Sequence, residues 1–275
     1  MNGKICVITG ANSGIGKATA LGLAKLGANV VMVCRNQTRG EEARKEIIDK
    51  TSNKNIDLLI ADLSSQQAIR QLVADFKKKY RQLHVLINDA GVVLRKRTLT
   101  TDGIETNFAV NYLAPFLLTN LLLDVLKKSA PARIINVTSG YYKRATINFD
   151  DLQSEKDYSA FGTYAKSKLA LVLFTRELSR RLKGTNVMVN VLHPGVIKSN
   201  LGRDMSAFSR LFTKIFFKSP KKGAETPIYL ASSPEVEGIS GKFFMNKKEA
   251  EFTEASGNEE IARKLWDISA KLTNL

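Results

Sequence analysis

Cysteine and histidine are scarce in this sequence, with two of each among 275 residues. Cys6 and Cys34 each lie in an apolar run of the kind that forms a buried strand, so we expect buried free thiols and not a disulfide. His84 and His193 belong to no Cys/His cluster, so no metal site is predicted, and His193 is interpreted as structural.

The sequence also lacks the segments that would direct it out of the cytosol or divide it into parts. No basic-then-apolar secretory signal opens it, and no window reaches the roughly 18 apolar residues of a membrane-spanning helix. Its six prolines are scattered, and no Gly/Ser/Pro-rich linker or repeat is visible. We therefore expect a cytoplasmic protein with a single domain over residues 1–275.

Acidic residues are outnumbered: 26 Asp and Glu stand against 42 Lys and Arg, which gives a formal charge of +16. A basic balance attracts phosphorylated cofactors, acidic lipid surfaces or nucleic acid, or it simply belongs to a solvated surface. The basic residues are spread along the chain without interleaved aromatic residues, so no nucleic-acid partner is predicted.

What the sequence does contain is an alternation of short apolar runs and helical stretches. Strands are predicted at 4–9, 29–33, 56–60, 84–87, 133–137, 187–192 and 241–245, and helices at 13–26, 41–50, 65–80, 105–128, 160–182 and 259–272. Strands without polar alternation suit a sheet that is covered on both faces. The pattern predicts an α/β fold with a doubly wound parallel sheet of about seven strands, whose ligands bind beyond the carboxyl ends of the strands.

A glycine-rich loop follows the first predicted strand. Gly10, Gly14 and Gly16 have the spacing G-x-x-x-G-x-G, with Asn12, Ser13 and Ile15 between them. Glycine permits a tight turn and a close approach of backbone to a pyrophosphate, and the next helix offers free N–H groups at its N-terminus. The alternative is an ordinary strand-to-helix turn, but the strand before and the helix after favour a dinucleotide loop.

The tips of the next two strands carry candidate contacts to a nucleotide. Arg35 stands where an acidic residue would hold the ribose hydroxyls of NAD, and it suits the 2′-phosphate of NADP instead. Arg39, one turn further on, is a candidate helper. Asp62 and Leu63 follow the third strand, where Asp62 either meets the adenine or caps the following helix.

Tyr164 and Lys168 stand four residues apart in a predicted helix, so both side chains leave the same face. A phenol beside a fixed ammonium loses its proton more easily, because the cation favours the phenolate. Such a tyrosine can give or take a proton at a carbonyl or alcohol oxygen.

Taken in order, these motifs make the chain resemble the short-chain dehydrogenase/reductase family. The resemblance runs from residue 4 to about residue 245, and its closest likeness is to the retinol-dehydrogenase-like branch. It rests on the glycine loop, Asn88-Asp89-Ala90-Gly91, Asn111, Ser139, Tyr164-x-x-x-Lys168 and Pro194-Gly195, and for the branch on the runs 167–170, 173–178 and 192–196. It implies a single-domain Rossmann fold.

The resemblance implies a catalytic tetrad of Asn111, Ser139, Tyr164 and Lys168. Tyr164 would be the general acid in reduction and the general base in oxidation, and Lys168 would lower its pKa and hold the nicotinamide ribose. Ser139 would polarise the substrate oxygen, and Asn111 would anchor a water that links Lys168 to solvent. The alternatives are purely structural roles: a loop cap for Ser139, a helix-face amide for Asn111 and a packing aromatic for Tyr164.

The resemblance also implies further cofactor contacts. Asn88, Ala90 and Gly91 would line the cofactor after the fourth strand, and Pro194, Gly195 and Ser199 after the sixth, with Ser199 standing where the family has threonine. One departure is clear, because Asp89 replaces the family's asparagine. An ionised carboxylate only accepts hydrogen bonds, and it could repel the phosphates of a cofactor.

A substrate lid is expected at residues 200–222, where the family varies most. Phe208, Leu211, Phe212, Ile215 and Phe216 recur at helical spacing beside Arg210, Lys214, Lys218, Lys221 and Lys222. An apolar face with a basic rim suits a lipophilic substrate or a peripheral membrane contact through 206–222. The alternative is a lid helix packed on its own domain. The related branch often carries an N-terminal membrane anchor, and none is expected here.

The leading hypothesis is therefore an oxidoreductase that prefers NADP(H) to NAD(H). It would move a hydride between nicotinamide and the carbon of a small or lipophilic alcohol, aldehyde or ketone. A non-catalytic dinucleotide sensor or scaffold is the second hypothesis, and a nucleic-acid binder the third. The resemblance also allows a homodimer or homotetramer that packs through the two long helices around the fifth strand.

Overall fold

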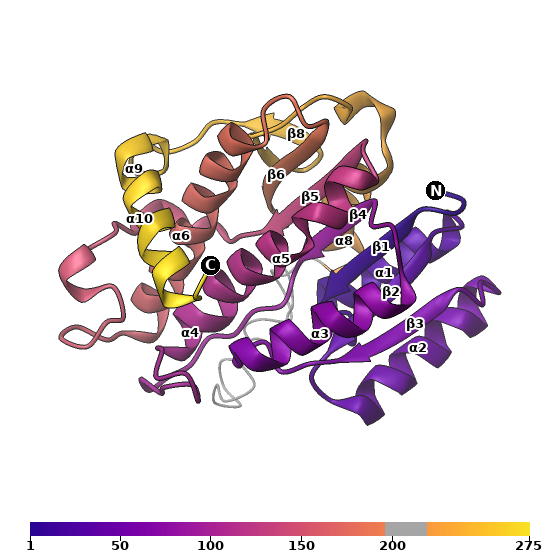
Figure 1. Ribbon diagram of the computed structural model, residues 1–275, viewed down its shortest axis with the longest axis horizontal. Helices are drawn as coiled ribbons and strands as arrows, with labels where there is room; N and C mark the ends of the chain where they lie inside the picture. The colour runs from indigo at the N-terminus through magenta and orange to yellow at the C-terminus, as the bar shows by residue number, and fades with distance from the viewer. Residues whose placement is uncertain (196–218) are drawn as a thin grey trace.

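The computed structural model describes residues 1–195 and 219–275, and its strands form one mixed sheet (Figure 1). The strand order is β3-β2-β1-β4-β5-β6-β7-β8, and every pairing is parallel except that of β7 with β8. The bounds are β1 Ile5–Thr9, β2 Asn29–Cys34, β3 Ile56–Ile60, β4 Val85–Asn88, β5 Ala132–Val137, β6 Val187–His193, β7 Phe243–Met245 and β8 Lys248–Ala250. The seven predicted strands are confirmed, and the antiparallel β8 is an eighth that the sequence analysis missed.

Helices cover both faces of this sheet, as the alternating pattern predicts. The helices are α1 Gly14–Lys25, α2 Gln37–Thr51, α3 Gln66–Lys79, α4 Thr106–Phe108, α5 Ala114–Lys128, α6 Ala160–Arg181, α8 Pro220–Ser232, α9 Glu254–Gly257 and α10 Glu259–Leu272. One core cluster packs the sheet against α1, α2 and α8, and another packs it against α3, α5, α6 and α10 (Figure 1). This is the doubly wound arrangement, and the Rossmann-like prediction is confirmed.

The start of α2 lies four residues earlier than the apolar pattern predicted. The helix begins at Gln37 because the Asn36 side chain accepts a hydrogen bond of 2.9 Å from the Arg39 N–H, which caps the first turn. The buried positions of the helix begin only at Gly40 and Ala43, so hydrophobic periodicity could not reveal its first turn.

The helix predicted at 105–128 is interrupted near its start. The Glu105 carboxylate caps α4 by accepting hydrogen bonds from the N–H groups of Asn107 and Phe108, at 2.9 and 2.7 Å. A π-helical turn, Ala109–Leu113, then separates α4 from α5. Such turns change the direction of side chains and are frequent at functional sites. This one carries the predicted tetrad member Asn111.

Contrary to the expectation from the sequence, one stretch within the described part of the chain, Thr106–Lys128, is long and apolar enough to cross a membrane. Most of it is already buried inside the fold, where Phe116, Leu117 and Leu126 pack in the main core. Its apolar composition is therefore explained by its contacts with the sheet and with α6.

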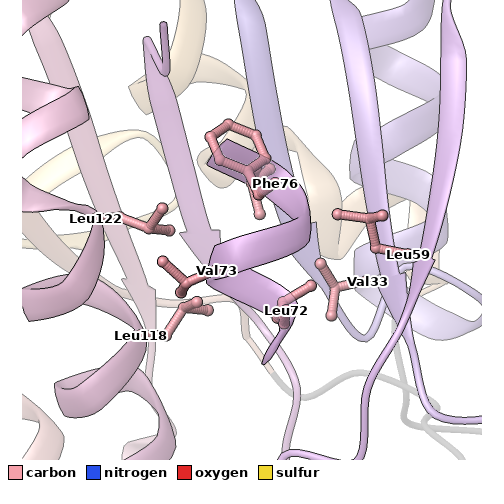
Figure 2. Close-up of a pocket in the computed structure, with 8 residues that line it drawn as sticks. Val33, Leu59, Leu72, Val73, Phe76, Leu118 and Leu122 are labelled. Atoms are coloured by element: carbon pink, nitrogen blue, oxygen red, sulfur yellow. The ribbon is translucent and has the colours of Figure 1, made fainter. Parts of the chain in front are cut away.

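A cavity of about 10 Å³ lies between α3, α5 and strands β1 to β3 (Figure 2). Its walls are entirely aliphatic or aromatic, with Leu72, Val73 and Phe76 from α3 facing Leu118 and Leu122 from α5. A space of this size holds one water molecule at most. It belongs to the core and offers nothing to a substrate.

The C-terminal helix α10 covers part of the outer face of α5 and α6 (Figure 1). Trp266 stacks on Phe174 with ring centroids 5.7 Å apart and meets Phe116 edge-on at 4.9 Å, while the Arg181 guanidinium lies 4.2 Å from its ring. This is the helix pair through which the family resemblance would join two subunits. Contact between subunits across the covered part would require α10 to move.

The predicted lid at 200–222, and with it most of the amphipathic run at 206–222, lies outside the described residues. Only Ser219 and the first turn of α8 fall within them. The Ser219 hydroxyl caps α8 by accepting a hydrogen bond from the Lys222 N–H.

Candidate active site

The glycine loop forms a tight cradle between β1 and α1. Gly10 and Gly14 have φ angles of +70° and +57°, which side chains rarely adopt. A Cβ on Gly10 would stand 3.0 Å from the Ala90 Cα, and one on Gly16 would stand 2.6 Å from the Gly10 carbonyl oxygen. The first N–H groups of α1 have no partner within the helix. The cradle therefore fits a pyrophosphate, which Asn12, Ser13 and Ile15 would help to surround.

Thr9 ties this loop to the loop after β4. Its hydroxyl accepts hydrogen bonds from the N–H groups of Asp89 and Ala90, at 3.0 and 3.1 Å. It stands beside the Ile87 carbonyl oxygen, 3.4 Å away, to which it donates. No role was predicted for Thr9 from the sequence. A hydroxyl at the end of a predicted apolar strand, directly before Gly10, was the available signal.

The tip of β2 presents Arg35 to solvent beside the start of α2. Within the described part of the chain no carboxylate pairs with Arg35 or Arg39, so both guanidinium groups can meet an anion. Cys34 is buried beneath the loop, where burial raises the pKa of its thiol to about 12 and the amides of Ala11 and Asn12 oppose that rise. Both Cys34 and Cys6 are free buried thiols, as predicted.

The alternative in which Asp62 caps α3 is wrong, and its contact with an adenine stays a prediction. The cap is Ser65, whose hydroxyl accepts a hydrogen bond of 3.2 Å from the Ala68 N–H. Asp62 instead accepts from the N–H and the hydroxyl of Ser64, at 2.9 and 2.8 Å, which fixes the turn after β3. Leu63 packs against the edge of the main core.

Tyr164 and Ser139 meet at the carboxyl end of β5, from different elements. Tyr164 lies in the first turns of α6, and Ser139 precedes the 3₁₀ turn Gly140–Arg144, which it caps by accepting a hydrogen bond from the Tyr141 N–H. The Ser139 side chain is near enough to the Tyr164 phenol to oppose the rise of its pKa. Ser139 is thus a cap, as its structural alternative predicts, and it is also a partner of the tyrosine.

The expectation that Lys168 acidifies Tyr164 is not met. Burial raises the pKa of Tyr164 to about 12; the Ser139 side chain opposes this rise, and the negative charge of Asp89 adds to it. The Lys168 Nζ lies over the Tyr164 ring, 5.8 Å from its centre. Tyr164 is therefore held as a neutral phenol, a form that can donate a proton.

Lys168 is buried next to Asn111 and Gly91. Its Nζ donates to the Val137 carbonyl oxygen at 3.0 Å, and a Cβ on Gly91 would come within 3.5 Å of it. Burial lowers the pKa of Lys168 to about 8, and the negative charge of Asp89 opposes that fall. A buried ammonium with one carbonyl partner keeps donors to spare for a ligand.

Asn111 holds the loop after β4 from its place in the π-helical turn. Its side-chain oxygen accepts from the Val92 N–H at 2.8 Å, and its amide donates to the Val92 carbonyl and to the Ser167 hydroxyl at 2.9 and 3.0 Å. The side chain is thereby fully engaged with protein groups. The predicted relay through a water at Asn111 stays a prediction.

Asn88 does not turn its side chain to the crevice. Its amide donates to the Thr119 hydroxyl and to the Asn136 side-chain oxygen, at 3.2 and 2.8 Å, and Asn136 in turn donates to Thr175. This buried chain of polar groups joins β4 and β5 to α5 and α6. Asn88 therefore fixes the sheet from within, and the cofactor contacts expected of Asn88, Ala90 and Gly91 stay predictions.

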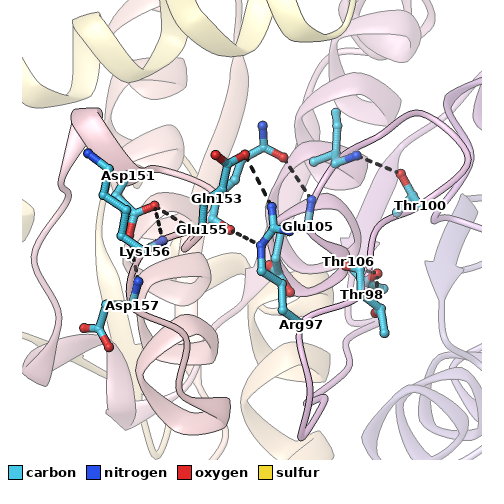
Figure 3. Close-up of polar contacts among 11 residues, drawn as sticks. Arg97, Thr98, Thr100, Glu105, Thr106, Asp151, Gln153, Glu155, Lys156 and Asp157 are labelled. Atoms are coloured by element: carbon cyan, nitrogen blue, oxygen red, sulfur yellow. Dashed lines mark hydrogen bonds and ion pairs between the residues drawn. The ribbon is translucent and has the colours of Figure 1, made fainter.

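The loops that follow β4 and precede α6 are tied together by polar side chains (Figure 3). Arg97, after β4, donates to the Gln153 carbonyl at 3.2 Å and lies 3.4 Å from the Glu155 carboxylate. The Gln153 side chain accepts from the Glu105 N–H at 3.0 Å. The Asp151 carboxylate accepts hydrogen bonds from the backbone N–H groups of Glu155 and the two residues after it. These bonds hold the loop before α6 in a turn.

The tip of β6 is fastened to the loop that carries Ser139. The His193 Nδ1 accepts a hydrogen bond of 3.1 Å from the Gly140 N–H, which supports the structural role predicted for it. Pro194 and Gly195 follow, half-buried, with Gly195 at a φ of +91°. Ser199 lies outside the described residues. Among those that are described, no group of three or more His, Cys, Asp or Glu residues could hold a metal ion.

Comparisons with known proteins agree with this geometry. A family model described as short chain dehydrogenase matches residues 4–209. Retinol dehydrogenase 14 from Homo sapiens is 48% identical, over 100% of this chain and 88% of that protein.

Solved structures share the fold across most of their length. A crystal structure of an uncharacterized protein from Mycobacterium paratuberculosis superposes with a TM-score of 0.82 at 30% identity, over 99% of this chain and 94% of that one. The RhlG/NADP active-site complex from Pseudomonas aeruginosa gives 0.73 at 25% identity, over 89% and 94%. The fold, the motifs and these similarities show that the protein is a short-chain dehydrogenase/reductase of the retinol-dehydrogenase-like branch, an oxidoreductase that acts on CH–OH groups with NAD(P).

Proposed function

We propose that this enzyme uses NADP(H) to interconvert lipophilic alcohols with aldehydes or ketones, with Tyr164 as the group that transfers the proton. The observation that carries the proposal is the meeting of Tyr164, Ser139 and Lys168 beside the glycine loop, at one edge of the sheet. A sensor or scaffold would have no need of a buried phenol paired with a serine hydroxyl.

The residues divide the chemistry between them. A bound nicotinamide dinucleotide would supply or accept the hydride. The glycine loop and Lys168 would hold it, the latter with the donors that the Val137 carbonyl leaves free. Ser139 and Tyr164 would donate hydrogen bonds to the substrate oxygen, and Tyr164 would give its proton to that oxygen in reduction and take it back in oxidation.

The preference for NADP(H) is argued from the tip of β2. Arg35 is exposed there with no carboxylate partner in the described part of the chain, and no acidic residue stands at 34–36 to hold two ribose hydroxyls. A guanidinium gives a phosphate paired, charge-assisted hydrogen bonds. The NADP named in the Pseudomonas aeruginosa complex is consistent with this preference.

The preference for a lipophilic substrate is argued from two exposed aromatic rings. Tyr141 and Phe161 are 42% and 49% exposed and stack at 5.5 Å, with an interplanar angle of 18°. Tyr141 also meets Tyr164 edge-on at 6.2 Å. An apolar wall next to the proton-transferring phenol suits a flat or elongated apolar substrate.

A substrate panel with a matched variant tests the proposal. Wild-type protein should consume NADPH with medium-chain aldehydes, retinoids or ketones, and Tyr164→Phe should lose at least about 100-fold in kcat. Equilibrium binding of NADPH to Tyr164→Phe should match wild type, since only the hydroxyl is removed. Equal turnover by the variant, or no turnover by wild type across the panel, would contradict the proposal.

A further inference from the structure

The one clear departure from the family motif, Asp89, lies in the middle of the site. Its N–H donates to the Thr9 hydroxyl, and its carboxylate lies against Gly16 in the first turn of α1. A Cβ on Gly16 would stand 2.7 Å from its Oδ2. The carboxylate therefore occupies the end of α1 whose free N–H groups would otherwise attract a phosphate.

Among the described residues, the charge that acts on Asp89 comes from α6. From α6, Lys168 places its positive charge near the carboxylate, and Tyr164 faces it as a neutral phenol. From β1 and α1, Asp89 meets the uncharged hydroxyl of Thr9 and the amide of Gly16. Burial raises the pKa of Asp89 to about 7, and Lys168 and the Gly16 amide restrain that rise. Near neutral pH the group is divided between its charged and neutral forms.

A dinucleotide in this cradle would bring its phosphates to the same helix end as the carboxylate. Two negative groups at one site repel each other, and the titratable one responds by binding a proton. An asparagine at this position could not respond, because its amide carries no charge in either state.

We propose that Asp89 couples dinucleotide binding to proton uptake: the complex forms with the Asp89 carboxyl group protonated, and the proton is taken from solvent. This inference rests on the proposed function, because it requires a dinucleotide at the glycine loop. No other bond is made or broken. The neutral carboxyl group gains an O–H that can donate a hydrogen bond, which restores part of what an asparagine offers.

The sign of the effect follows from linkage. A complex that holds one more proton than the free protein is favoured at low pH. The affinity for the dinucleotide is therefore highest below pH 7. It falls at higher pH by up to about tenfold per pH unit, until the complex itself loses the proton. In Asp89→Asn this contribution is absent at every pH.

The test is the dissociation constant of NADPH, measured by its fluorescence at pH 6, 7, 8 and 9. We expect the ratio of the wild-type to the Asp89→Asn constant to rise by more than about tenfold between pH 6 and pH 9. Asp124→Asn removes one exposed carboxylate of α5, paired with Lys77, and should leave the pH dependence unchanged. If Asp89→Asn fails to fold, Asp89→Ala removes the same titration.

A second comparison separates Asp89 from Lys168, whose charge also responds to phosphates. In a Lys168→Met background, the ratio of the dissociation constants without and with the Asp89→Asn substitution should still rise with pH. Calorimetry in two buffers of different ionisation enthalpy should show more protons taken up by wild type than by Asp89→Asn. A ratio that stays constant from pH 6 to 9, or that becomes constant without Lys168, overturns the inference. Wild-type protein that binds no NADPH even at pH 6 refutes the proposed function itself.

Discussion

The two halves of the crevice are built in different ways. At the nucleotide end, the cradle consists of backbone from one short segment, Gly10 to Gly16, shaped by positive φ angles and by contact with the Ala90 backbone. At the catalytic end, Ser139, Tyr164, Lys168 and Asn111 come from distant parts of the chain, and hydrogen bonds hold them. Because backbone geometry tolerates no added atom while side-chain contacts can adjust, the nucleotide end should be the less forgiving of substitution.

Gly16→Ala should have the largest effect on binding. The added Cβ would stand 2.6 Å from the Gly10 carbonyl oxygen, so the loop itself must shift. A displacement of this kind costs about 3 kcal/mol, which corresponds to a loss of about 100-fold in NADPH affinity. Gly22→Ala is the matched control, since its Cβ would press only on the flexible Ile228 side chain. Equal losses in titrations of both variants would remove the contrast between the two ends.

Arg35→Asp should change the choice of dinucleotide at the nucleotide end. Loss of charge-assisted hydrogen bonds to a 2′-phosphate should weaken NADPH by about thirtyfold, or about 2 kcal/mol. NADH, which lacks that phosphate, should be affected much less. Arg39→Asp serves as the neighbouring control with a smaller change. Parallel loss of both dinucleotides in fluorescence titrations would contradict the preference for NADP(H).

Thr9→Val probes the link between the two ends. The variant keeps the shape of the residue but leaves the N–H groups of Asp89 and Ala90 without their acceptor. The free energy of unfolding should fall by about 2 kcal/mol, with a several-fold loss in NADPH affinity. Thr9→Ser, which retains the hydroxyl, should stay near wild type in denaturant melts. A variant as stable as wild type would show that the loops hold each other without Thr9.

Arg97→Ala should have the smallest effect. Its ion pair with the exposed Glu155 carboxylate contributes at most about 1 kcal/mol. The remaining ties between these loops, through Gln153 and Asp151, stay in place. We expect a shift of a few degrees or less in Tm and kcat/KM within about threefold of wild type. A large loss of activity would mean that this loop pair positions the catalytic end more directly than its contacts indicate.

Much of the fold could be predicted because its strands are short, purely apolar runs. The α8 helix escaped prediction because Pro220 and Pro227 interrupt its helical pattern, although it buries Ala224 and Leu230. The π-helical turn before α5 escaped because it has the same composition as the helix around it. The small strand β8 escaped because two of its three residues are charged and it pairs with β7 over only three residues.

The candidate site, like the fold, could be predicted from the sequence only in part. The motifs identified the loop, the tetrad and Arg35, because each has a residue type and a spacing that the chemistry requires. They could not show that Asn88 turns into the core or that Asp62 leaves the cap of α3 to Ser65, because each depends on neighbours distant in sequence or on local rotamers. They also gave Lys168 the wrong effect on Tyr164, because spacing along a helix does not report burial.

By itself the sequence determined the alternation of strands and helices, the glycine cradle and the presence of a phenol, a hydroxyl and an ammonium at family spacing. Only the tertiary structure decided the electrostatic state of these groups: a buried neutral Tyr164, a Lys168 of lowered pKa, and Asp89 between that lysine and the end of α1. The reason is that composition and periodicity are local properties of a chain. The free energy of a charge depends instead on the solvent removed from around it and on every charge that the fold brings near.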